Sequence, residues 1–413
     1  MQFDFILVGN VDGVLSNLPK ALKSAGFNIL VIGAPGMPLI KSPWIDSSLI
    51  LSSNTQSLFL EELFTKEEFL NDLSGTFLWS SDQIMREVAE SEVPLNLKLK
   101  LLPIRDENYL EMLGSKIGQF ERMSTLGIPY PQSQRIGSKL ELAVSELTIQ
   151  GKALAKGDNS GGGAQVRIFE SVSREDLTAI PDEWFPILLQ EFVPANRIGV
   201  EAYYRDGELV QWFYSIVESD LTPLGPSMGR TYLIPESLDF LDHLEKIGKS
   251  ANLDGFINVS LLIDSETGLH KFFEFDSRPN VWHHIFIDFN VPFQDIWNKR
   301  MKFLPNSYVP IPMKLFEPVR LFKYFLERWN VIGAFQVFQN KRVSKYGIAI
   351  SSVFYEPDYR TFNILKLVLL PIAPFTRRIL RALVYLKKCT PSSLSARIDK
   401  SRTKALFVKF LAE

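Results

Sequence analysis

One lysine of this chain stands directly before a loop that is rich in glycine. The segment KALAKGDNSGGGAQVRIFES places Lys156 at the end of an apolar run, and Gly157, Gly161, Gly162 and Gly163 follow it. Glycine has no side chain, so backbone amides can approach phosphate oxygens there, and the lysine adds a full positive charge. The pattern favours phosphate binding, with a flexible hairpin loop as the alternative.

A proline break interrupts the next pair of apolar runs, in PILLQEFVPANRIGVEAYYRDGELV. An interrupted strand can offer main-chain groups to the edge of an adenine ring, and Gln190 or Glu191 can add a side-chain partner. Taken alone, the same segment predicts only two strands.

Two acidic residues lie on a third segment, in which INVSLLID and HKFFEFD flank the turn SETG. Strand alternation puts Glu274 and Asp276 on one face. With a turn of about five residues, Ser260 lies opposite Glu274 and Asn258 lies opposite Asp276, beside Arg278. Oxygen ligands suit magnesium, and arginine neutralises charge on a transferring group. A solvated strand face with one ion pair is the alternative.

The elements that would position these residues begin with a parallel α/β unit. FDFILV, the loop GNVDG, the amphipathic VLSNLPKALKSAG and NILVIG predict strand, loop, helix and strand. TFLWS before SDQIMREVAES predicts another such unit, in which Ser80 or Ser81 caps the helix. GNVDG lacks the G-x-G-x-x-G spacing of a dinucleotide loop, which favours a scaffold role.

A helical pattern in NYLEMLGSKIGQFERMSTLG ends at Gly127, and the prolines of IPYPQ predict an extended exit and a domain boundary. Short strands then alternate with helices at residues 139–148 and 238–251, which indicates an α+β region with antiparallel strands. Further helices are predicted at residues 319–329 and from residue 362.

Charge is distributed unevenly along the 413 residues. The net charge is −2, but residues 360–413 hold twelve Lys or Arg against Asp399 and Glu413, so this segment carries +10 and the remainder −12. We expect a basic helical extension that packs on the core, binds an anionic substrate or touches an acidic membrane surface. No aromatic and basic interleaving specific to RNA is present, so no nucleic-acid partner is expected.

A cytoplasmic location is the expectation from the remaining features. Cys389 is the one cysteine, and MQFDFILVGN lacks the features of a secretory signal. The most apolar stretch, residues 367–376, contains two prolines and is half of the roughly 20 residues that a spanning helix needs. We therefore predict no transmembrane helix, with peripheral membrane contact through the basic segment as an option.

In this order, the three segments resemble the ATP-grasp superfamily over about residues 105–300. By that resemblance, Lys116 and Lys156 are the two nucleotide-binding lysines, Gly161, Gly162 and Gly163 form the flap over the phosphates, and Gln190, Glu191 and Val193 hold adenine. Glu274 and Arg278 match the ends of the motif E-x-N-x-R, as metal ligand and catalytic arginine.

Several positions depart from the family pattern. Asp276 stands where asparagine is usual and is kept as a second metal ligand, while Ser260 stands where a further acidic or amide ligand is expected. Arg197 replaces an acidic ribose contact. Arg230 lies where members often place a basic residue near the acylphosphate, and it is a second catalytic candidate.

The resemblance implies an α/β plus α+β fold. Its parts would be an N-terminal doubly wound domain (1–104), a two-lobed ATP-grasp domain (105–300, with a small lobe at about 130–193 and a metal hairpin at 257–278) and a basic helical extension (301–413). The implied cofactors are ATP and Mg²⁺, with Mn²⁺ as an alternative ion. The sequence does not fix the oligomeric state, and a homodimer is one option.

The implied reaction converts a carboxylate and ATP into an acylphosphate and ADP, and an amine then displaces phosphate. RPNVWHH follows the metal motif, so Asn280, Trp282, His283 and His284 are expected near the mouth of the site, with Asn280, His283 and His284 as candidate substrate contacts. A carboxylase or carbamoyl-phosphate-type enzyme that phosphorylates bicarbonate is one alternative. A nucleotide-binding pseudoenzyme with an acidic partner or membrane surface is the other.

Overall fold

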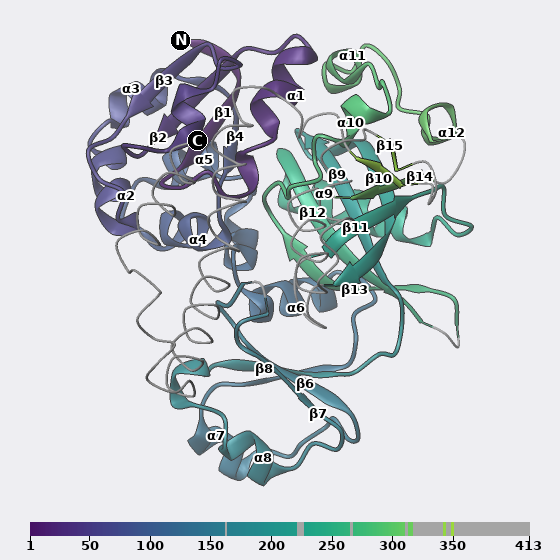
Figure 1. Cartoon of the computed structure of the whole chain (residues 1–413). Helices are drawn as coiled ribbons and strands as arrows, with labels where there is room; N and C mark the ends of the chain where they lie inside the picture. The colour runs from purple at the N-terminus through teal and green to yellow at the C-terminus, as the bar shows by residue number, and fades with distance from the viewer. Residues whose placement is uncertain are drawn as a thin grey trace, which may run out of the picture.

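The computed structural model describes residues 1–161, 163–220, 227–264, 267–309, 313–316, 342–343 and 348–350. Gly162, Cys389, the apolar stretch at 367–376 and the helices predicted at 319–329 and from residue 362 lie outside these residues. Three sheets organise the described chain (Figure 1).

The N-terminal domain contains a parallel sheet of strand order β3-β2-β1-β4. Its strands are β1 (Gln2–Gly9), β2 (Ile29–Gly33), β3 (Ser47–Ile50) and β4 (Ser74–Trp79). The helices are α1 (Leu18–Ser24), α2 (Gln56–Phe64), α3 (Glu67–Asp72), α4 (Asp82–Glu90) and α5 (Leu95–Leu101), with 3-10 turns η1 (Gly13–Leu15) and η2 (Pro38–Lys41). All of β2 is buried, as expected for a parallel strand covered on both faces. Of the two serines predicted to cap this helix, Ser81 is the N-cap of α4, and its hydroxyl accepts from the Ile84 amide.

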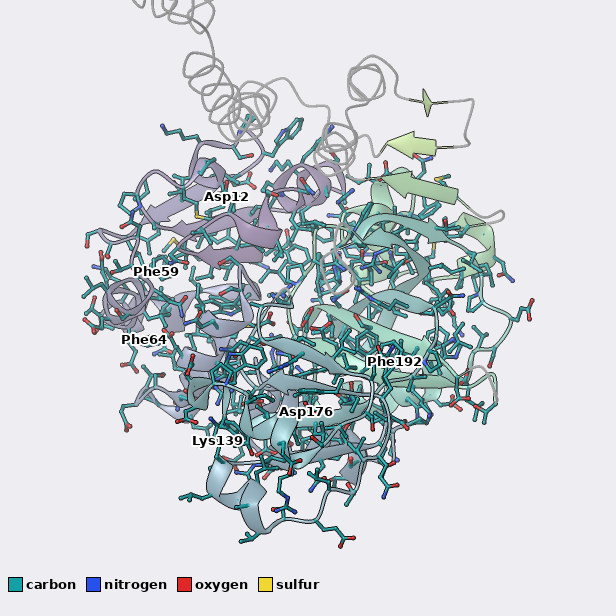
Figure 2. The ribbon with its side chains drawn as sticks, turned by 60° about the horizontal axis from the view of Figure 1, so that its bottom comes forward. Asp12, Phe59, Phe64, Lys139, Asp176 and Phe192 are labelled. Atoms are coloured by element: carbon teal, nitrogen blue, oxygen red, sulfur yellow. The ribbon has the colours of Figure 1, made fainter. Side chains whose placement is uncertain are left out.

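A small antiparallel sheet of order β5-β8-β6-β7 forms a separate lobe at the bottom of Figure 1. It consists of β5 (Ser133–Ile136), β6 (Ala153–Gly157), β7 (Val166–Phe169) and β8 (Ile187–Glu191), with α7 (Lys139–Val144), α8 (Arg174–Thr178) and the 3-10 turn η4 (Asp182–Trp184). Lys139 on α7 and Asp176 on α8 lie at this end of the molecule, away from Phe59 and Phe64 on α2 (Figure 2).

The helix predicted at residues 139–148 is shorter in the structure. It ends at Val144, because Ser145 adopts an extended conformation. Downstream, Thr148 donates from its amide to the Gln134 side chain over 3.0 Å, which ties this segment back to β5 instead of continuing the helix.

The third sheet has eight strands in the order β13-β12-β9-β10-β11-β14-β16-β15. Its main strands are β9 (Arg197–Arg205), β10 (Glu208–Asp220), β11 (Ser227–Tyr232), β12 (Gly255–Ile263) and β13 (His270–Asp276). The 3-10 segment η3 (Glu107–Met112) and α6 (Lys116–Thr125) precede the small lobe, and α9 (Asp239–Ala251), α10 (Ile285–Asp288), α11 (Phe293–Trp297) and α12 (Pro305–Tyr308) accompany the large sheet.

The segment expected to be helical, 301–413, also contributes strands. Its described parts include β14 (Met313–Phe316), β15 (Arg342–Val343) and β16 (Ile348–Ile350), which extend the large sheet beyond β11. The prediction of a helical basic extension did not include these strands, and the helices it named lie outside the described residues.

The N-terminal domain and the large sheet share one hydrophobic core. Phe5 of β1 lies 5.4 Å from Phe256 of β12 and 5.0 Å from Trp297 of α11, measured between ring centroids. The small lobe has a core of its own, built around Ile136, Ala155 and Leu189. Within the described residues, no helix is long and apolar enough to cross a membrane.

Candidate active site

The acidic hairpin has the predicted register. Ser260 pairs with Glu274, and Asn258 pairs with Asp276, in the antiparallel ladder of β12 and β13. The sequence prediction of this cross-strand arrangement is therefore confirmed. Alternation places both carboxylates on the same face, beside the oxygen atoms of Asn258 and Ser260.

A β-bulge that the sequence did not reveal lies next to this pair. After Ser260 pairs with Glu274, Leu261 pairs with Phe272, so Phe273 has no cross-strand partner. Such an extra residue redirects the side chains on either side of it. Phe272 and Phe275 are buried, whereas Phe273 and Glu274 are half-buried. The bulge therefore lets both Phe273 and Glu274 leave the core side of β13.

Lys156 of the small lobe meets this bulge. Its ammonium group lies 5.4 Å from the centroid of the Phe273 ring. Burial lowers the pKa of Lys156 to about 8, and the nearby Glu274 carboxylate opposes that shift. The lysine-led loop and the acidic hairpin, 118 positions apart in the sequence, are thus neighbours in space.

The side chain of Gln190 fixes the Lys156 ammonium group, which donates to the Gln190 side-chain oxygen over 2.6 Å. The side-chain nitrogen of Gln190 donates to the Ser133 hydroxyl over 3.0 Å. The Glu191 carboxylate accepts from the Gln132 amide over 2.9 Å and lies 3.4 Å from the Lys271 ammonium. Both side chains thus have partners within the protein, and their predicted role beside adenine stays a prediction. The main chain at Glu191 and the half-buried Val193 remain as candidate adenine contacts.

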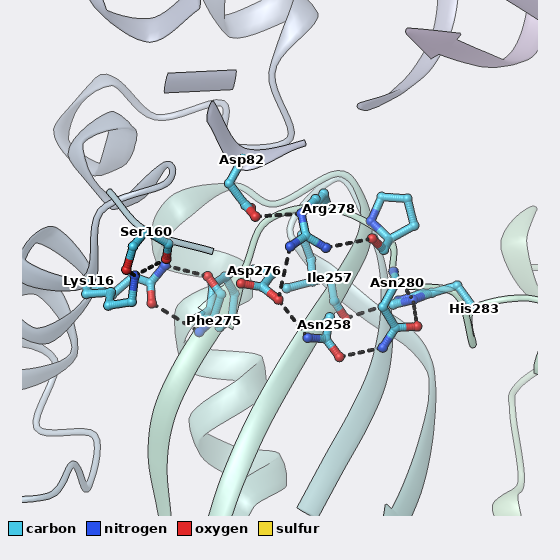
Figure 3. A network of polar contacts seen from close by, with 12 residues as sticks. Asp82, Lys116, Ser160, Ile257, Asn258, Phe275, Asp276, Arg278, Asn280 and His283 are labelled. Carbon is cyan, nitrogen blue, oxygen red and sulfur yellow. Dashed lines mark hydrogen bonds and ion pairs between the residues drawn. The ribbon is translucent and has the colours of Figure 1, made fainter. Parts of the chain in front are cut away.

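Lys116 lies at the first turn of α6 and reaches the loop that follows β6. Its ammonium group donates to the carbonyl oxygen of Ser160 (Figure 3). It also donates to the carbonyl oxygen of Asp158 over 3.3 Å. Gly161 has no atom within 4 Å of the place where a Cβ would stand, and Gly163 has a φ of +79°. Lys116 therefore lies at the base of a glycine-rich loop with room above it.

The carboxylate of Asp158 holds that loop against α6 and the N-terminal domain. It accepts from the Ser115 hydroxyl over 2.8 Å and the Ile117 amide over 2.9 Å. Its second oxygen lies 2.9 Å from Arg86 of α4. Because Asp158 is almost fully buried, these charge-assisted bonds are of the stronger kind.

Helix α6 is anchored to the acidic hairpin by one glutamine. The side chain of Gln119 donates to the Phe275 carbonyl over 2.7 Å and accepts from the Phe275 amide over 3.1 Å. The side-chain amide of Gln119 thus makes the same two hydrogen bonds to the Phe275 backbone that a neighbouring strand would make. This contact sets the position of Lys116 relative to Glu274.

Charge around the acidic pair is partly compensated. No hydrogen bond or ion pair joins the Glu274 carboxylate to another residue in the described part of the chain, whereas Asp276 accepts from Asn258 over 2.8 Å and lies 3.6 Å from Arg278. Burial, together with the Asp276 charge, raises the pKa of Glu274. Two carboxylates in one desolvated place are what a divalent cation would stabilise.

Arg230 stands on β11, three strands beyond β12, on the same face of the sheet. Ser260 pairs with Gly199, which pairs with Ser215. A Cβ at Gly199 would lie 1.3 Å from a terminal nitrogen of the Arg230 guanidinium, so only glycine leaves room for it. That nitrogen donates to the Ser215 hydroxyl over 3.2 Å and lies 3.4 Å from the Glu201 carboxylate.

The predicted position of the two histidines near the mouth of the site is wrong. His283 and His284 are fully buried. The His283 ring contacts the Asn280 side chain and the Ile257 carbonyl and stacks on Phe256. Burial lowers the pKa of His283 to about 3, so the ring is neutral. It positions the chain around Asn280 and does not face a substrate.

Asn280 belongs to a buried chain of polar contacts. Its side-chain nitrogen donates to Asn258 over 2.5 Å and to the fully buried Glu201 over 3.3 Å. Asn258 in turn donates to Asp276 (Figure 3). The row Asp276, Asn258 and Glu201 therefore runs across three adjacent strands.

Sequence reasoning missed four residues that build this site, namely Asp82, Gln119, Asp158 and Glu201. Asp158 stood inside the quoted glycine loop, and its charge next to Lys156 was an available signal. The others come from separate elements, and only the fold brings them together. Among the described residues, no cluster of three or more His, Cys, Asp or Glu side chains could hold a metal.

No family model matches the chain, and no curated protein matches it in sequence. Among solved structures, an N5-carboxyaminoimidazole ribonucleotide synthetase in complex with ADP is 14% identical, with 79% of this chain and 85% of that chain covered and a TM-score of 0.57. An L-amino acid ligase from Bacillus licheniformis is 11% identical, with 75% of each chain covered and a TM-score of 0.51. Phosphoribosylglycinamide synthetase from Anaerococcus prevotii is 14% identical, with coverages of 75% and 76% and a TM-score of 0.51. At these identities the likeness concerns the fold.

Proposed function

The chain has the ATP-grasp fold, and from that premise we propose that it is an ATP-dependent ligase that activates a carboxylate and couples it to an amine. The observation that carries the proposal is the meeting of Lys156 with the bulge beside Glu274. A buried ammonium group and a half-buried carboxylate pair at one place suit a triphosphate that arrives with a divalent cation.

The residues fit the metal that the fold implies. Glu274 has no competing hydrogen bond within the described chain, and its raised pKa reflects burial and the neighbouring Asp276. Glu274 and Asp276 would hold Mg²⁺, or Mn²⁺ in its place. The ion would supply charge neutralisation for the β- and γ-phosphates. Ser260 offers only a neutral hydroxyl, a poorer ligand than a carboxylate.

The chain's own side chains then have separate tasks. Lys156 and Lys116 would hold phosphate oxygens, and residues 191–193 would bond the adenine edge through their main chain. The glycines at 161–163 would close over the phosphates. Arg278 and Arg230 would face the group in transfer, where positive charge stabilises the developing negative charge.

In the proposed reaction, a carboxylate oxygen of the substrate attacks the γ-phosphorus, and the bond from that phosphorus to the bridging oxygen of ADP breaks. An amine nitrogen then attacks the carbonyl carbon of the acylphosphate. The bond from that carbon to the phosphate oxygen breaks, phosphate leaves, and the nitrogen loses a proton. Such chemistry asks for positioning and charge neutralisation and needs no protein nucleophile.

Bicarbonate as the activated carboxyl compound is the second candidate. N5-carboxyaminoimidazole ribonucleotide synthetases are among the solved structures with this fold, and one has the TM-score of 0.57 given above. Bicarbonate dependence of ADP release, in the absence of any other carboxylate, would favour this reaction. A nucleotide-binding pseudoenzyme, suggested by Ser260, is the remaining alternative. It would bind MgATP, but no substrate would cause it to release ADP.

The test is a panel of amino acids, other carboxylic acids, amines and bicarbonate, with ADP release as the readout. We expect ADP release that requires one carboxylate and one amine together, and that is lost in Glu274→Gln with the melting temperature retained. ATP binding without ADP release for any pair would contradict the ligase proposal. Equal turnover in the wild type and in Glu274→Gln would remove the site assignment.

A further inference from the structure

An aspartate of the N-terminal domain contacts the arginine of the proposed site. The side-chain Nε of Arg278 donates to an Asp82 carboxylate oxygen over 2.6 Å (Figure 3). Asp82 is the first residue of α4, directly after the carboxyl end of the parallel strand β4. Ligands of open α/β sheets bind at that edge. The contact therefore joins the ligand-binding edge of one domain to the phosphate end of the other.

Three partners together define the orientation of Arg278. Besides Asp82 on Nε, one terminal nitrogen donates to the Pro279 carbonyl over 3.2 Å, and the other lies 3.6 Å from Asp276. The Arg278 and Asp82 side chains are 18% and 25% exposed, so the pair is partly shielded from water and solvent screens it less than a surface pair. A planar guanidinium held at Nε and at both terminal nitrogens has one orientation.

Asp82 also ends a longer chain of contacts. From Arg278 the contacts continue through Asp276 to Asn258, and from there through Asn280 to Glu201. Every link is a hydrogen bond or ion pair between described side chains. A change at Asp82 therefore reaches the proposed metal ligand Asp276 as well as Arg278.

We propose that Asp82 is a positioning residue that orients Arg278, so that the phosphate site is complete only while the carboxyl edge of the N-terminal sheet is docked against it. The proposal rests on the function proposed above. The side-chain partner of Asp82 is Arg278, and Asp82 acts through the direction in which Arg278 presents its remaining N–H groups.

A second contact between the same two parts supplies the matched control. Arg105 lies 2.8 Å from the buried Asp254 at the start of β12, and Asp254 also accepts from Thr76 of β4 over 2.8 Å. The bond from Thr76 to Asp254 joins the N-terminal domain to the large sheet as the Asp82 pair does, but it lies outside the contacts of Arg278. A purely structural role predicts equal consequences for Asp82→Asn and Asp254→Asn.

The test measures Asp82→Asn, Asp82→Glu and Asp254→Asn in the full chain by two readouts. In the ADP-forming reaction, we expect Asp82→Asn to lower kcat by about tenfold or more. This loss should be smaller than the roughly 10²- to 10³-fold loss that follows removal of a charge-stabilising donor. KM for ATP should stay within about twofold, because the role proposed for Arg278 is at the group in transfer, and the lysines and the main chain at 191–193 are proposed to hold the rest of the nucleotide. Asp82→Glu should restore part of kcat, and Asp254→Asn should leave kcat unchanged while lowering the melting temperature.

The second readout is the NMR signal of the Arg278 Nε–H, assigned through Arg278→Lys. It should be shifted and protected in the wild type and in Asp254→Asn, and it should move toward the free position in Asp82→Asn. An unchanged signal in Asp82→Asn, or a kcat equal to that of Asp254→Asn, overturns the proposal. If the wild type releases no ADP, the proposed function fails. The NMR signal of Arg278 alone then decides whether Asp82 positions Arg278. A response to MgADP in the wild type but not in Asp82→Asn then supports positioning, and equal responses refute it.

Discussion

The two halves of the proposed nucleotide site are built on bodies of different construction. Glu274 and Asp276 stand on the large sheet, which shares one continuous core with the N-terminal domain through contacts such as Phe5 with Phe256. Lys156 stands on the small lobe, whose core is separate. One half is therefore fixed by apolar packing that extends across two domains, and the other by packing within a single small unit.

The contacts between the halves are polar. Lys116 and Arg86 hold the loop at Asp158 and Ser160, and Lys271 holds Glu191. Polar contacts can exchange with water at modest cost, whereas an apolar core cannot open without exposing its surface. We therefore expect the small lobe to open locally at a lower free-energy cost than the shared core.

Truncation of the shared core should have the largest effect. Phe256→Ala removes a fully buried ring and should lower the free energy of unfolding by about 3–5 kcal/mol, with loss of amide protection in both the N-terminal domain and the large sheet. Leu189→Ala, in the small-lobe core, should cost about 2–5 kcal/mol and lower protection in β5 to β8 alone. Denaturant unfolding with hydrogen exchange measures both. Equal loss of protection in β1 and β8 for Leu189→Ala would erase the distinction.

Removing the polar contacts of Asp158, which hold the small lobe to α6 and the N-terminal domain, should have a smaller and local effect. Asp158→Ala leaves the Ser115 hydroxyl and the Ile117 amide without their acceptor and removes one of the partners of Arg86, at a cost of about 1–3 kcal/mol. We expect faster exchange at residues 157–161 and weaker MgADP binding. Asp176→Ala, in the α8 capping box of the same lobe, is the matched control and should leave MgADP binding unchanged. Normal exchange at residues 157–161 in Asp158→Ala would count against this role of the polar contacts.

The smallest effect is a proton taken up on binding. Burial lowers the pKa of Lys156 from 10.5 to about 8, so about half of the side chains are neutral at pH 8. Phosphate oxygens would raise that pKa again, so MgADP binding should take up as much as about half a proton at pH 8 and almost none at pH 6. Calorimetry in buffers of different ionisation enthalpy measures the uptake. The same uptake in Lys156→Met would assign it to another group.

The same pKa shift gives the unmodified protein a defined pH dependence. Between about pH 8 and 10.5 the unfolded state holds more protons than the folded state, so stability should rise as the pH increases across this window. Lys156→Met should remove that rise.

Much of the site could be predicted from local patterns. The alternation of HKFFEFD and the turn length fixed the pairing of Ser260 with Glu274, because register follows from period and loop. Lys156 was predicted from a strand that runs into glycines. Both are properties of contiguous residues, which one sequence displays directly.

What the sequence did not reveal depends on separate elements that meet in the fold. The bulge at Phe273 arises from how β12 and β13 pair, and the clearance for Arg230 arises from Gly199 on another strand. His283 and His284 were misplaced because they follow the metal motif closely in sequence, whereas the chain after Arg278 turns them into the core. Asp82 lies 196 positions from its partner Arg278, a distance that no local pattern spans.

Binding of MgADP to Lys156→Met and Glu274→Gln, compared by calorimetry with the wild type, tests most directly whether both halves hold one nucleotide. We predict that each variant binds at least about tenfold more weakly, which corresponds to about 1.4 kcal/mol, with its melting temperature retained. Wild-type affinity in either variant would mean that the lysine loop and the acidic hairpin do not act on the same ligand.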